Sequence, residues 1–286
     1  MDSQNSKKSP LIFNIQRFSI HDGGGIRTII FFKGCALHCP WCSNPEGISA
    51  KRQLLRNDKR CLRCSATDAY HCTNSPQECP VNALSYCGDI YSIEQLVEEV
   101  ARDQIMYDED DGGLTLSGGE PLLYPEFLKE FLPRLKPWMN SIAVETSGNI
   151  PFHNIHAVLP YIDLFLYDLK ILDSHSFHHI CGGNLATVIS NLEQLVSLKK
   201  RVIPRIPLVP TFTDSPANIE KIAALVATLG VDQVHLLPFH QVGSVKYEQL
   251  QIPYTLSELN PPTADQIAAA VHRFQSKGLH VIVGGL

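Results

Sequence analysis

Three cysteines in the N-terminal part of the chain have a spacing suited to an iron–sulfur cluster. Cys35, Cys39 and Cys42 are separated by three and then two residues, in a segment expected to be a loop. A cubane cluster has four irons, so three thiolates leave one iron without a protein ligand. That open iron could chelate the amino and carboxylate groups of a bound ligand. The alternative is a zinc ion bound by these thiolates with His38 or with a later cysteine.

Four further cysteines precede a proline, as in the ferredoxin motif, but at wider spacings. They are separated by two, seven and six residues: Cys61, Cys64, Cys72 and Cys79. The compact bacterial ferredoxin run has spacings of about two, two and three residues before its Cys-Pro. We expect these four thiolates to hold one auxiliary [4Fe–4S] cluster. A zinc knuckle or a metal-free insert are the alternatives, and Cys87 could replace one of the four.

The distribution of cysteines and the composition indicate where the protein works. Eight of the nine cysteines lie between Cys35 and Cys87, in a chain of 286 residues. Disulfide scaffolds are short and secreted, so this crowding favours metal ligands in a reducing compartment. The N-terminal sequence MDSQNSKKSP is polar, the apolar run after it is too short for a signal peptide, and no segment is long enough to span a membrane. With a net charge of −5 there is no basic field for nucleic acid, so we expect a cytoplasmic protein with neither a membrane nor a nucleic-acid partner.

Short apolar segments alternate with amphipathic stretches along the rest of the chain. Helices are predicted after the N-cap signatures at Ser92, Ser215 and Thr263, and over residues 184–200. Repeated strand–helix units predict parallel strands, and therefore an α/β fold with a doubly wound sheet or a (β/α) barrel. The apolar segments predicted to be strands are residues 11–18, 28–35, 114–119, 141–148, 163–170, 202–209, 233–240 and 280–285.

The cysteine-rich segment over residues 51–91 interrupts this alternation. It holds five cysteines and little periodicity, so we expect it to form a small inserted domain. The barrel would then consist of residues 11–50 and 92–286, preceded by a polar tail of residues 1–10.

Residues able to bind ligands recur at the predicted C-terminal ends of the strands. In parallel α/β folds that edge of the sheet is where ligands bind and chemistry takes place. A single site at this edge is therefore predicted. Its members are Cys35, Gly118, Gly119, Glu120, Glu145, Thr146, Asp168, Lys170 and His240.

Together these motifs resemble a known family. C-x3-C-x2-C followed by a GGE turn is similar to the radical S-adenosylmethionine (SAM) superfamily. The run HDGGGIRTIIFFKGCALHCPWCSNPE, followed in order by LTLSGGEPLLYPEF, VETSG, YDLK, RIPLVP and LLPFHQVGSVKYEQL, resembles the glycyl-radical-enzyme activating enzymes of the pyruvate formate-lyase activase kind. The resemblance covers about residues 11–286. It extends to the larger members of the family, which carry a ferredoxin-like insert. It implies a partial (β/α)6 barrel of the TIM type.

The resemblance also implies an activity. A [4Fe–4S] cluster on Cys35, Cys39 and Cys42 would cleave SAM reductively to a 5′-deoxyadenosyl radical. The radical would take a hydrogen atom from a glycine of a partner glycyl radical enzyme. Flavodoxin or ferredoxin would supply the electron. The partner's glycine loop would enter the mouth of the barrel, near which we expect the segment Asp22–Gly25.

The same resemblance assigns roles to individual residues. Trp41 would lie against the adenine of SAM, and the Gly118–Gly119–Glu120 turn would present backbone groups to the methionine amino end. Bare glycines suit such a turn, because a ligand must approach the backbone closely. Asp168 and Lys170 match a D-x-K motif beside SAM and the substrate glycine.

Two further pairs complete the expected site. Arg205 and His240 match positions that contact SAM. Glu145 and Thr146 match positions that supply oxygen ligands to a monovalent cation near the SAM carboxylate, although the family's usual residue at 145 is Asp. Cys181 resembles no ligand, and the histidines at 175, 178 and 179 are expected in a solvated loop.

Three other classes of function would use some of these features. A radical SAM enzyme acting on a small molecule would share the cysteine trio and the GGE turn. A ferredoxin-type electron-transfer protein would need only the insert. A zinc-dependent nucleic-acid module would need a basic face, which the acidic composition does not favour.

Overall fold

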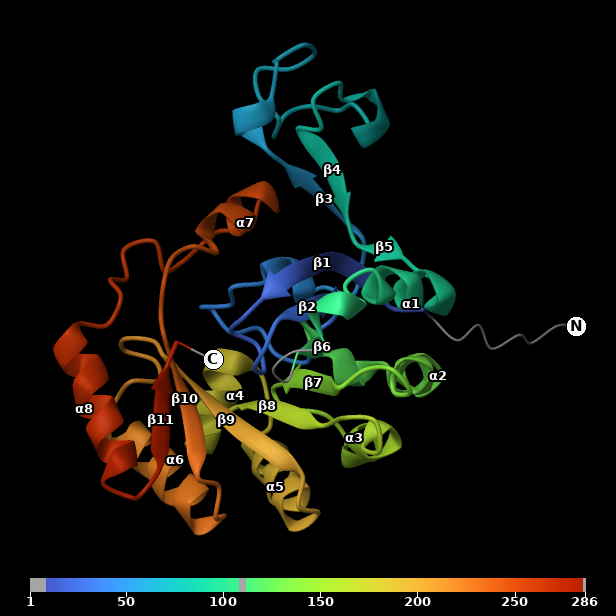
Figure 1. Ribbon diagram of the computed structural model, residues 1–286. Coiled ribbons are helices and arrows are strands. Elements are labelled where there is room, and N and C mark those ends of the chain that lie inside the picture. The colour runs from blue at the N-terminus through green and yellow to red at the C-terminus, as the bar shows by residue number, and fades with distance from the viewer. Residues whose placement is uncertain (1–8, 108–111, 285–286) are drawn as a thin grey trace, which may run out of the picture.

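The computed structural model describes residues 9–107 and 112–284. Its main sheet has the strand order β11-β10-β9-β8-β7-β6-β2-β1-β5 (Figure 1). Every neighbouring pair from β2 to β11 in that order is parallel. The strands are β1 (Leu11–Ser19), β2 (Arg27–Phe32), β5 (Asp89–Ile90), β6 (Gly113–Gly118), β7 (Ser141–Thr146), β8 (Leu164–Asp168), β9 (Arg201–Leu208), β10 (Gln233–Pro238) and β11 (His280–Val283).

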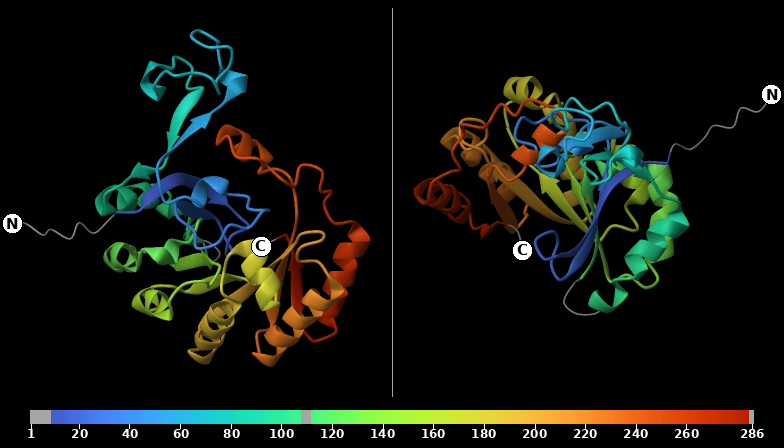
Figure 2. Two further views of the ribbon diagram at one scale, coloured as in Figure 1. Left: turned by 180° about the vertical axis from the view of Figure 1, so that it is seen from behind. Right: turned by 90° about the horizontal axis from the view of Figure 1, so that it is seen from above.

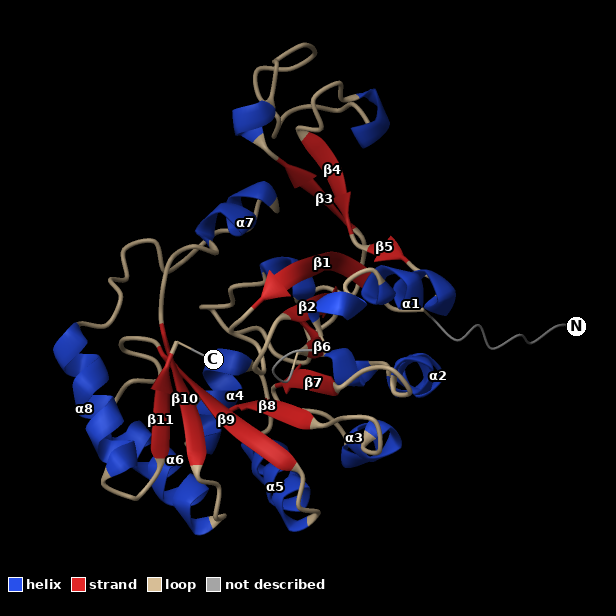
Figure 3. Ribbon diagram, viewed as in Figure 1, coloured by secondary structure: helices blue, strands red, loops and turns tan. Residues whose placement is uncertain are grey.

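Helices alternate with the parallel strands and cover the outer side of the curved sheet (Figures 2 and 3). All six residues of β2 are buried, as expected for a strand with both faces covered. Among the described residues, no helix is both long and apolar enough to cross a membrane. The helices are α1 (Ile93–Ala101), α2 (Pro125–Leu135), α3 (Phe152–Val158), α4 (Ser174–Cys181), α5 (Leu185–Ser197), α6 (Pro216–Thr228), α7 (Ser244–Gln249) and α8 (Ala264–Gln275).

The helix starts expected from the sequence are confirmed. Ser92 and Thr263 form capping boxes at α1 and α8. The Ser215 hydroxyl accepts the Asn218 N–H at the start of α6, and Asn184 caps α5. Because each cap satisfies an N–H group that has no partner within its own helix, these short local signals fix where the helices begin.

The first strand departs from the parallel pattern. β1 is antiparallel to β2, since the connection over residues 20–26 is too short for a parallel crossover. β1 and β11 do not pair with each other, so the sheet stays open between them. This is the partial barrel that the sequence predicted.

The glycine-rich connection between β1 and β2 lies at the opposite end of the barrel from the one expected. The Asp22 carbonyl accepts the Thr115 hydroxyl at 2.7 Å, and the Gly24 carbonyl accepts Arg27 Nη1 at 3.2 Å. Arg27 begins β2, and Thr115 lies near the start of β6. The expectation that Asp22–Gly25 lies near the mouth is therefore wrong: the segment lies at the N-terminal end of the barrel, from which Asp22 lines the cavity.

The cysteine-rich segment projects from the sheet as a separate lobe (Figure 1). Its only regular strands among the described residues, β3 (Gln53–Arg56) and β4 (Leu84–Cys87), pair antiparallel with each other. β5 lies within the range expected for the insert but pairs with β1 of the main sheet. The chain therefore rejoins the barrel two residues after β4. Most of the polar tail, residues 1–8, lies outside the described residues.

Candidate functional site

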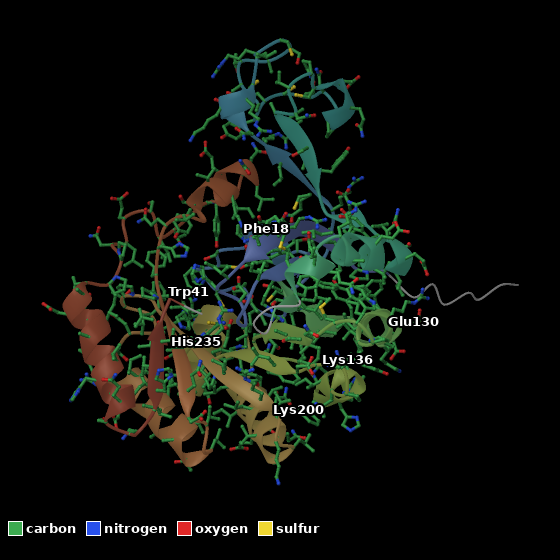
Figure 4. The ribbon with its side chains drawn as sticks, viewed as in Figure 1. Phe18, Trp41, Glu130, Lys136, Lys200 and His235 are labelled. Atoms are coloured by element: carbon green, nitrogen blue, oxygen red, sulfur yellow. The ribbon has the colours of Figure 1, made fainter. Side chains whose placement is uncertain are left out.

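The C-terminal ends of the parallel strands surround one cavity of about 450 Å³. Figure 4 draws the side chains of the described residues and labels Trp41, which lines this cavity. A cavity of this size is in the usual range for small-molecule sites. The expected site residues that line it are Cys35, Cys39, Trp41, Cys42, Gly118, Gly119, Glu145, Thr146, Asp168, Lys170, Arg205 and His240.

The three cysteines of the trio are held on the loop after β2. The backbone N–H of Cys35 donates to the Ile48 carbonyl at 3.1 Å, and that of Cys42 to the Cys39 carbonyl at 3.1 Å. The Leu37 N–H donates to Cys35 Sγ at 3.4 Å, a contact common around cluster thiolates. Burial raises the pKa of Cys35 and of Cys42 to about 12. These thiols would ionise when bound iron supplies positive charge.

A fourth cysteine lies against the trio. Cys181, at the end of α4, is fully buried, and its carbonyl accepts the His38 N–H at 3.0 Å. A hydrogen bond between the Cys39 and Cys181 thiols, together with burial, raises the pKa of Cys39. The histidines at 175, 178 and 179 lie on α4 and not in a loop as expected. No local pattern indicated this contact, because it joins segments about 140 residues apart in the sequence.

The glycines of the GGE turn are required by the protein's own backbone. The Gly119 N–H donates to the Phe32 carbonyl at 2.7 Å, and the Glu120 N–H to the Gly34 carbonyl at 2.7 Å. A Cβ on Gly119 would collide with the Gly34 carbonyl oxygen, and Gly118 has φ +105°. The turn thus packs directly on the start of the cysteine loop, a reason for glycine that the sequence analysis did not consider.

The Glu120 side chain faces away from the cavity. It is fully buried and accepts hydrogen bonds from the Thr146 hydroxyl at 3.0 Å and from the Ser147 N–H and hydroxyl at 2.9 and 2.8 Å. Burial raises the pKa of Glu120, while the Ser147 and Thr146 donors favour the carboxylate. Glu120 therefore ties the end of β6 to the end of β7.

Charged side chains of opposite sign meet on the cavity wall. Lys170 is 9% exposed, and its Nζ lies 2.6 Å from Asp168 Oδ2. Burial by itself would lower the pKa of Lys170, but the Asp168 charge raises it above its usual value. Arg205 forms an ion pair with Glu145 and lies 3.8 Å from Asp22 Oδ1. The site can therefore bind a ligand that carries both signs of charge.

The segment after β10 closes over the cysteine loop. The Tyr247 hydroxyl on α7 donates to the Cys42 carbonyl at 2.9 Å, and Lys246 Nζ lies 3.1 Å from a Glu46 carboxylate oxygen. Trp41 packs at 5.4 Å, centroid to centroid, on Phe212. The sequence analysis quoted this segment in the LLPFHQVGSVKYEQL motif but assigned no role to Tyr247 or Lys246.

The four cysteines of the insert line one small hollow: Cys61, Cys64, Cys72 and Cys79. Cys79 Sγ accepts the Ala83 N–H at 3.2 Å, and backbone donors, that of Leu84 first, lower the pKa of Cys79. Cys87 lies apart from this group, buried at the end of β4 opposite Gln53. Within residues 9–107 and 112–284, no group of three or more His, Cys, Asp or Glu is arranged to hold a single metal ion.

Comparisons with known proteins agree with the motifs and the geometry. The model of the radical SAM superfamily matches residues 29–226. The pyruvate formate-lyase 2-activating enzyme of Escherichia coli (strain K12) is 42% identical over 274 residues, which cover 96% of this chain and 92% of that protein. The indoleacetate decarboxylase activating enzyme of Tractidigestivibacter scatoligenes is 33% identical over 315 residues, covering 99% of this chain and 100% of that protein. The crystal structure of a radical SAM methyltransferase from Sphaerobacter thermophilus matches with a TM-score of 0.56 at 18% identity. The match covers 90% of this chain and 66% of that chain, and it supports the fold alone.

The chain therefore belongs to the radical SAM superfamily and, within it, to the activating enzymes of glycyl radical enzymes. The superfamily implies a [4Fe–4S] cluster and SAM, and the activating enzymes imply a glycyl radical enzyme as partner. The expectations for family, fold and activity are confirmed. The roles of single residues stay predictions.

Proposed function

We propose that this chain activates a glycyl radical enzyme by reductive cleavage of SAM, with Cys35, Cys39 and Cys42 as the cluster ligands. The convergence of this trio with the strand-end residues in one cavity carries the proposal. When bound, the cluster would deliver one electron that breaks a C–S bond of SAM and yields the 5′-deoxyadenosyl radical.

The residues of the chain position the reactants and shield them. Asp168 and Lys170, held as an ion pair on the cavity wall, would orient SAM. His240, which is exposed and lines the cavity just after the end of β10, would contact it as well. Trp41, which lines the cavity and is backed by Phe212, would limit access of water and stray hydrogen donors to the radical. The partner's glycine must come within about 3–4 Å of the radical carbon, and the gap between β1 and β11 would admit a peptide loop.

We also propose that the insert is a domain that holds one auxiliary [4Fe–4S] cluster on Cys61, Cys64, Cys72 and Cys79. All four line one hollow, and backbone N–H groups point at the sulfurs of Cys61 and Cys79. Such N–H donors tune cluster thiolates in iron–sulfur proteins. Cys87, outside the hollow, is not among the proposed ligands.

The partner and the electron donor follow from the same assignment. The relative at 42% identity is named for pyruvate formate-lyase 2, so a glycyl radical enzyme of that kind is the first candidate partner. Flavodoxin or ferredoxin is the proposed electron donor, and the cytoplasm the proposed location.

Activation of the candidate partner tests this function. Anaerobic, reduced enzyme should convert SAM to 5′-deoxyadenosine and give the candidate turnover that it lacks alone. Cys39→Ala should abolish both. Production of 5′-deoxyadenosine without activation of any glycyl radical enzyme would instead support a small-molecule substrate.

A further inference from the structure

The carboxylate expected to ligate a monovalent cation is engaged elsewhere. One oxygen of Glu145 accepts Arg205 Nη1, and the other accepts the Ser117 hydroxyl. Both oxygens therefore already have donors from the protein. A cation at this carboxylate would have to lie beside a guanidinium of the same charge.

The second expected ligand is also engaged. The Thr146 hydroxyl donates to both carboxylate oxygens of Glu120, each at 3.0 Å, and accepts the Gly148 N–H at 3.0 Å. Its side-chain oxygen is turned towards the buried Glu120. The two side chains expected at a cation site thus do not fit a cation in this chain.

The positive charge beside Glu145 is the guanidinium of Arg205. Arg205 lines the cavity, and its Nη1 also lies 3.8 Å from Asp22 Oδ1. Its Nε is buried and has no hydrogen-bond partner among residues 9–107 and 112–284. Buried donors in native proteins almost always have acceptors, so an unpaired N–H on a cavity wall indicates that a ligand supplies one.

The length of Glu145 explains this arrangement. β8 separates β7 from β9 in the sheet, and the register places Glu145 level with Ile203, two residues before Arg205. The backbones of Glu145 and Arg205 therefore lie about 12 Å apart at the usual strand spacing and rise. Both side chains must extend along the cavity wall to meet. An aspartate at 145 would be shorter by one methylene group and would leave a gap between the two charges.

We propose that Arg205 supplies the positive charge at the SAM carboxylate in this chain, in place of a monovalent cation, and that Glu145 is the positioning residue that holds its guanidinium. SAM binding then needs no added K⁺ or Na⁺. Arginine suits this role because its charge is permanent and its fixed fork of donors can bind two carboxylates at once. The inference rests on the proposed function, since it concerns how SAM is held.

Equilibrium dialysis of SAM against the anaerobic, cluster-loaded and unreduced enzyme tests the inference. The affinity is measured in K⁺, Na⁺ or tetramethylammonium chloride at one ionic strength. The wild-type Kd should change less than about twofold among the three salts, a difference well below the 1.4 kcal/mol of a tenfold change. Binding at least about tenfold tighter in K⁺ than in tetramethylammonium would overturn it.

Two variants separate the role of charge from that of length. Glu145→Asp should release Arg205 and open the gap, so that SAM affinity in tetramethylammonium falls about tenfold and recovers in K⁺. Glu145→Gln keeps the length but loses the charge, so its affinity should fall in every salt without recovery. A Glu145→Asp variant that binds SAM like the wild type in every salt would contradict the positioning role.

The outcomes also distinguish this inference from the proposed function. Strong K⁺ dependence together with normal 5′-deoxyadenosine formation would contradict the inference alone. Absence of SAM binding in every salt would contradict the proposed function and the inference with it.

Discussion

Cys42 of the barrel and Cys79 of the insert are held by different kinds of contact. The Cys42 carbonyl accepts Tyr247 from α7, some 200 residues further along the chain, whereas Cys79 Sγ accepts the N–H of Ala83, four residues away. The barrel therefore builds its cysteine site from long-range packing, and the insert builds its own from local turns. A site made by long-range packing should exist before metal binds, whereas a site made of local turns should depend on its metal for order.

The lobe of the insert has little else to stabilise it. Only β3 and β4 pair within its described part, and isolated two-stranded hairpins are marginally stable in water. One contact to the barrel is the Tyr70 hydroxyl, which donates to Glu248 of α7 at 2.5 Å. Since α7 also contacts the cysteine loop through Tyr247, this helix joins the two regions.

The largest predicted difference is between removal of a barrel thiolate and removal of an insert thiolate. Cys39→Ala should abolish SAM cleavage, whereas Cys79→Ala should retain it with a chemical reductant. Each variant should lose about four irons per chain, because each would lack a ligand to one cubane cluster. Iron content and 5′-deoxyadenosine formation measure the two effects. Equal loss of SAM cleavage in both variants would contradict the prediction that only the barrel thiolates are needed for cleavage.

Removal of all iron by a chelator should disorder the insert and leave the barrel folded. Hydrogen exchange of the backbone amides should become faster in β3 and β4 and stay slow in β6 and β7, whose residues belong to the buried core. If the amides of β6 and β7 lost their protection from exchange to the same extent, the barrel site would depend on iron for its order as much as the insert does.

Loss of the α7 contacts should have smaller effects that differ between the two regions. Tyr247→Phe leaves the half-buried Cys42 carbonyl without its donor, so we expect a loss of about 1–2 kcal/mol in the free energy of unfolding of the barrel. Tyr70→Phe is the matched control, because it removes the equivalent hydroxyl from an exposed contact. Denaturant unfolding measures both, and an equal loss in the two variants would argue against α7 as a support of the cysteine loop.

The smallest predicted effect is a pH dependence within the barrel. His235 on β10 is buried, and burial followed by the Arg205 charge lowers its pKa to about 4. The unfolded chain binds this proton near pH 6.5, so stability should be lost as the pH falls from about 6.5 towards 4. Between pH 7.5 and 5.5 the loss should be about 1 kcal/mol, and His235→Gln should remove that part of the slope. An unchanged slope in the variant would mean that folding does not lower the pKa of His235.

The sequence predicted those parts of the fold that depend on local pattern. Strand hydrophobicity located the parallel strands, and capping residues such as Ser92 and Thr263 marked the helix starts. The C-terminal ends of the strands then brought Cys35, Asp168 and Arg205 into one cavity, because parallel strands share one edge.

What the sequence did not predict depends on the direction of side chains and on contacts between distant segments. No periodic pattern in the sequence indicates that the Glu120 side chain faces away from the cavity. None indicates the contact of Cys181 with Cys39 either. The antiparallel direction of β1, by contrast, was readable from the short connection to β2. Had that length been considered, the placement of Asp22 at the N-terminal end of the barrel would have followed.

The most direct test of the central claim is the EPR spectrum of the anaerobic, reduced enzyme mixed with SAM and a candidate glycyl radical enzyme. The account predicts a carbon-centred doublet that changes when the candidate's glycine is deuterated at Cα and that is absent with Cys39→Ala. A doublet that is unchanged by this deuteration, or one that persists in Cys39→Ala, would contradict the claim that this cavity produces the glycyl radical.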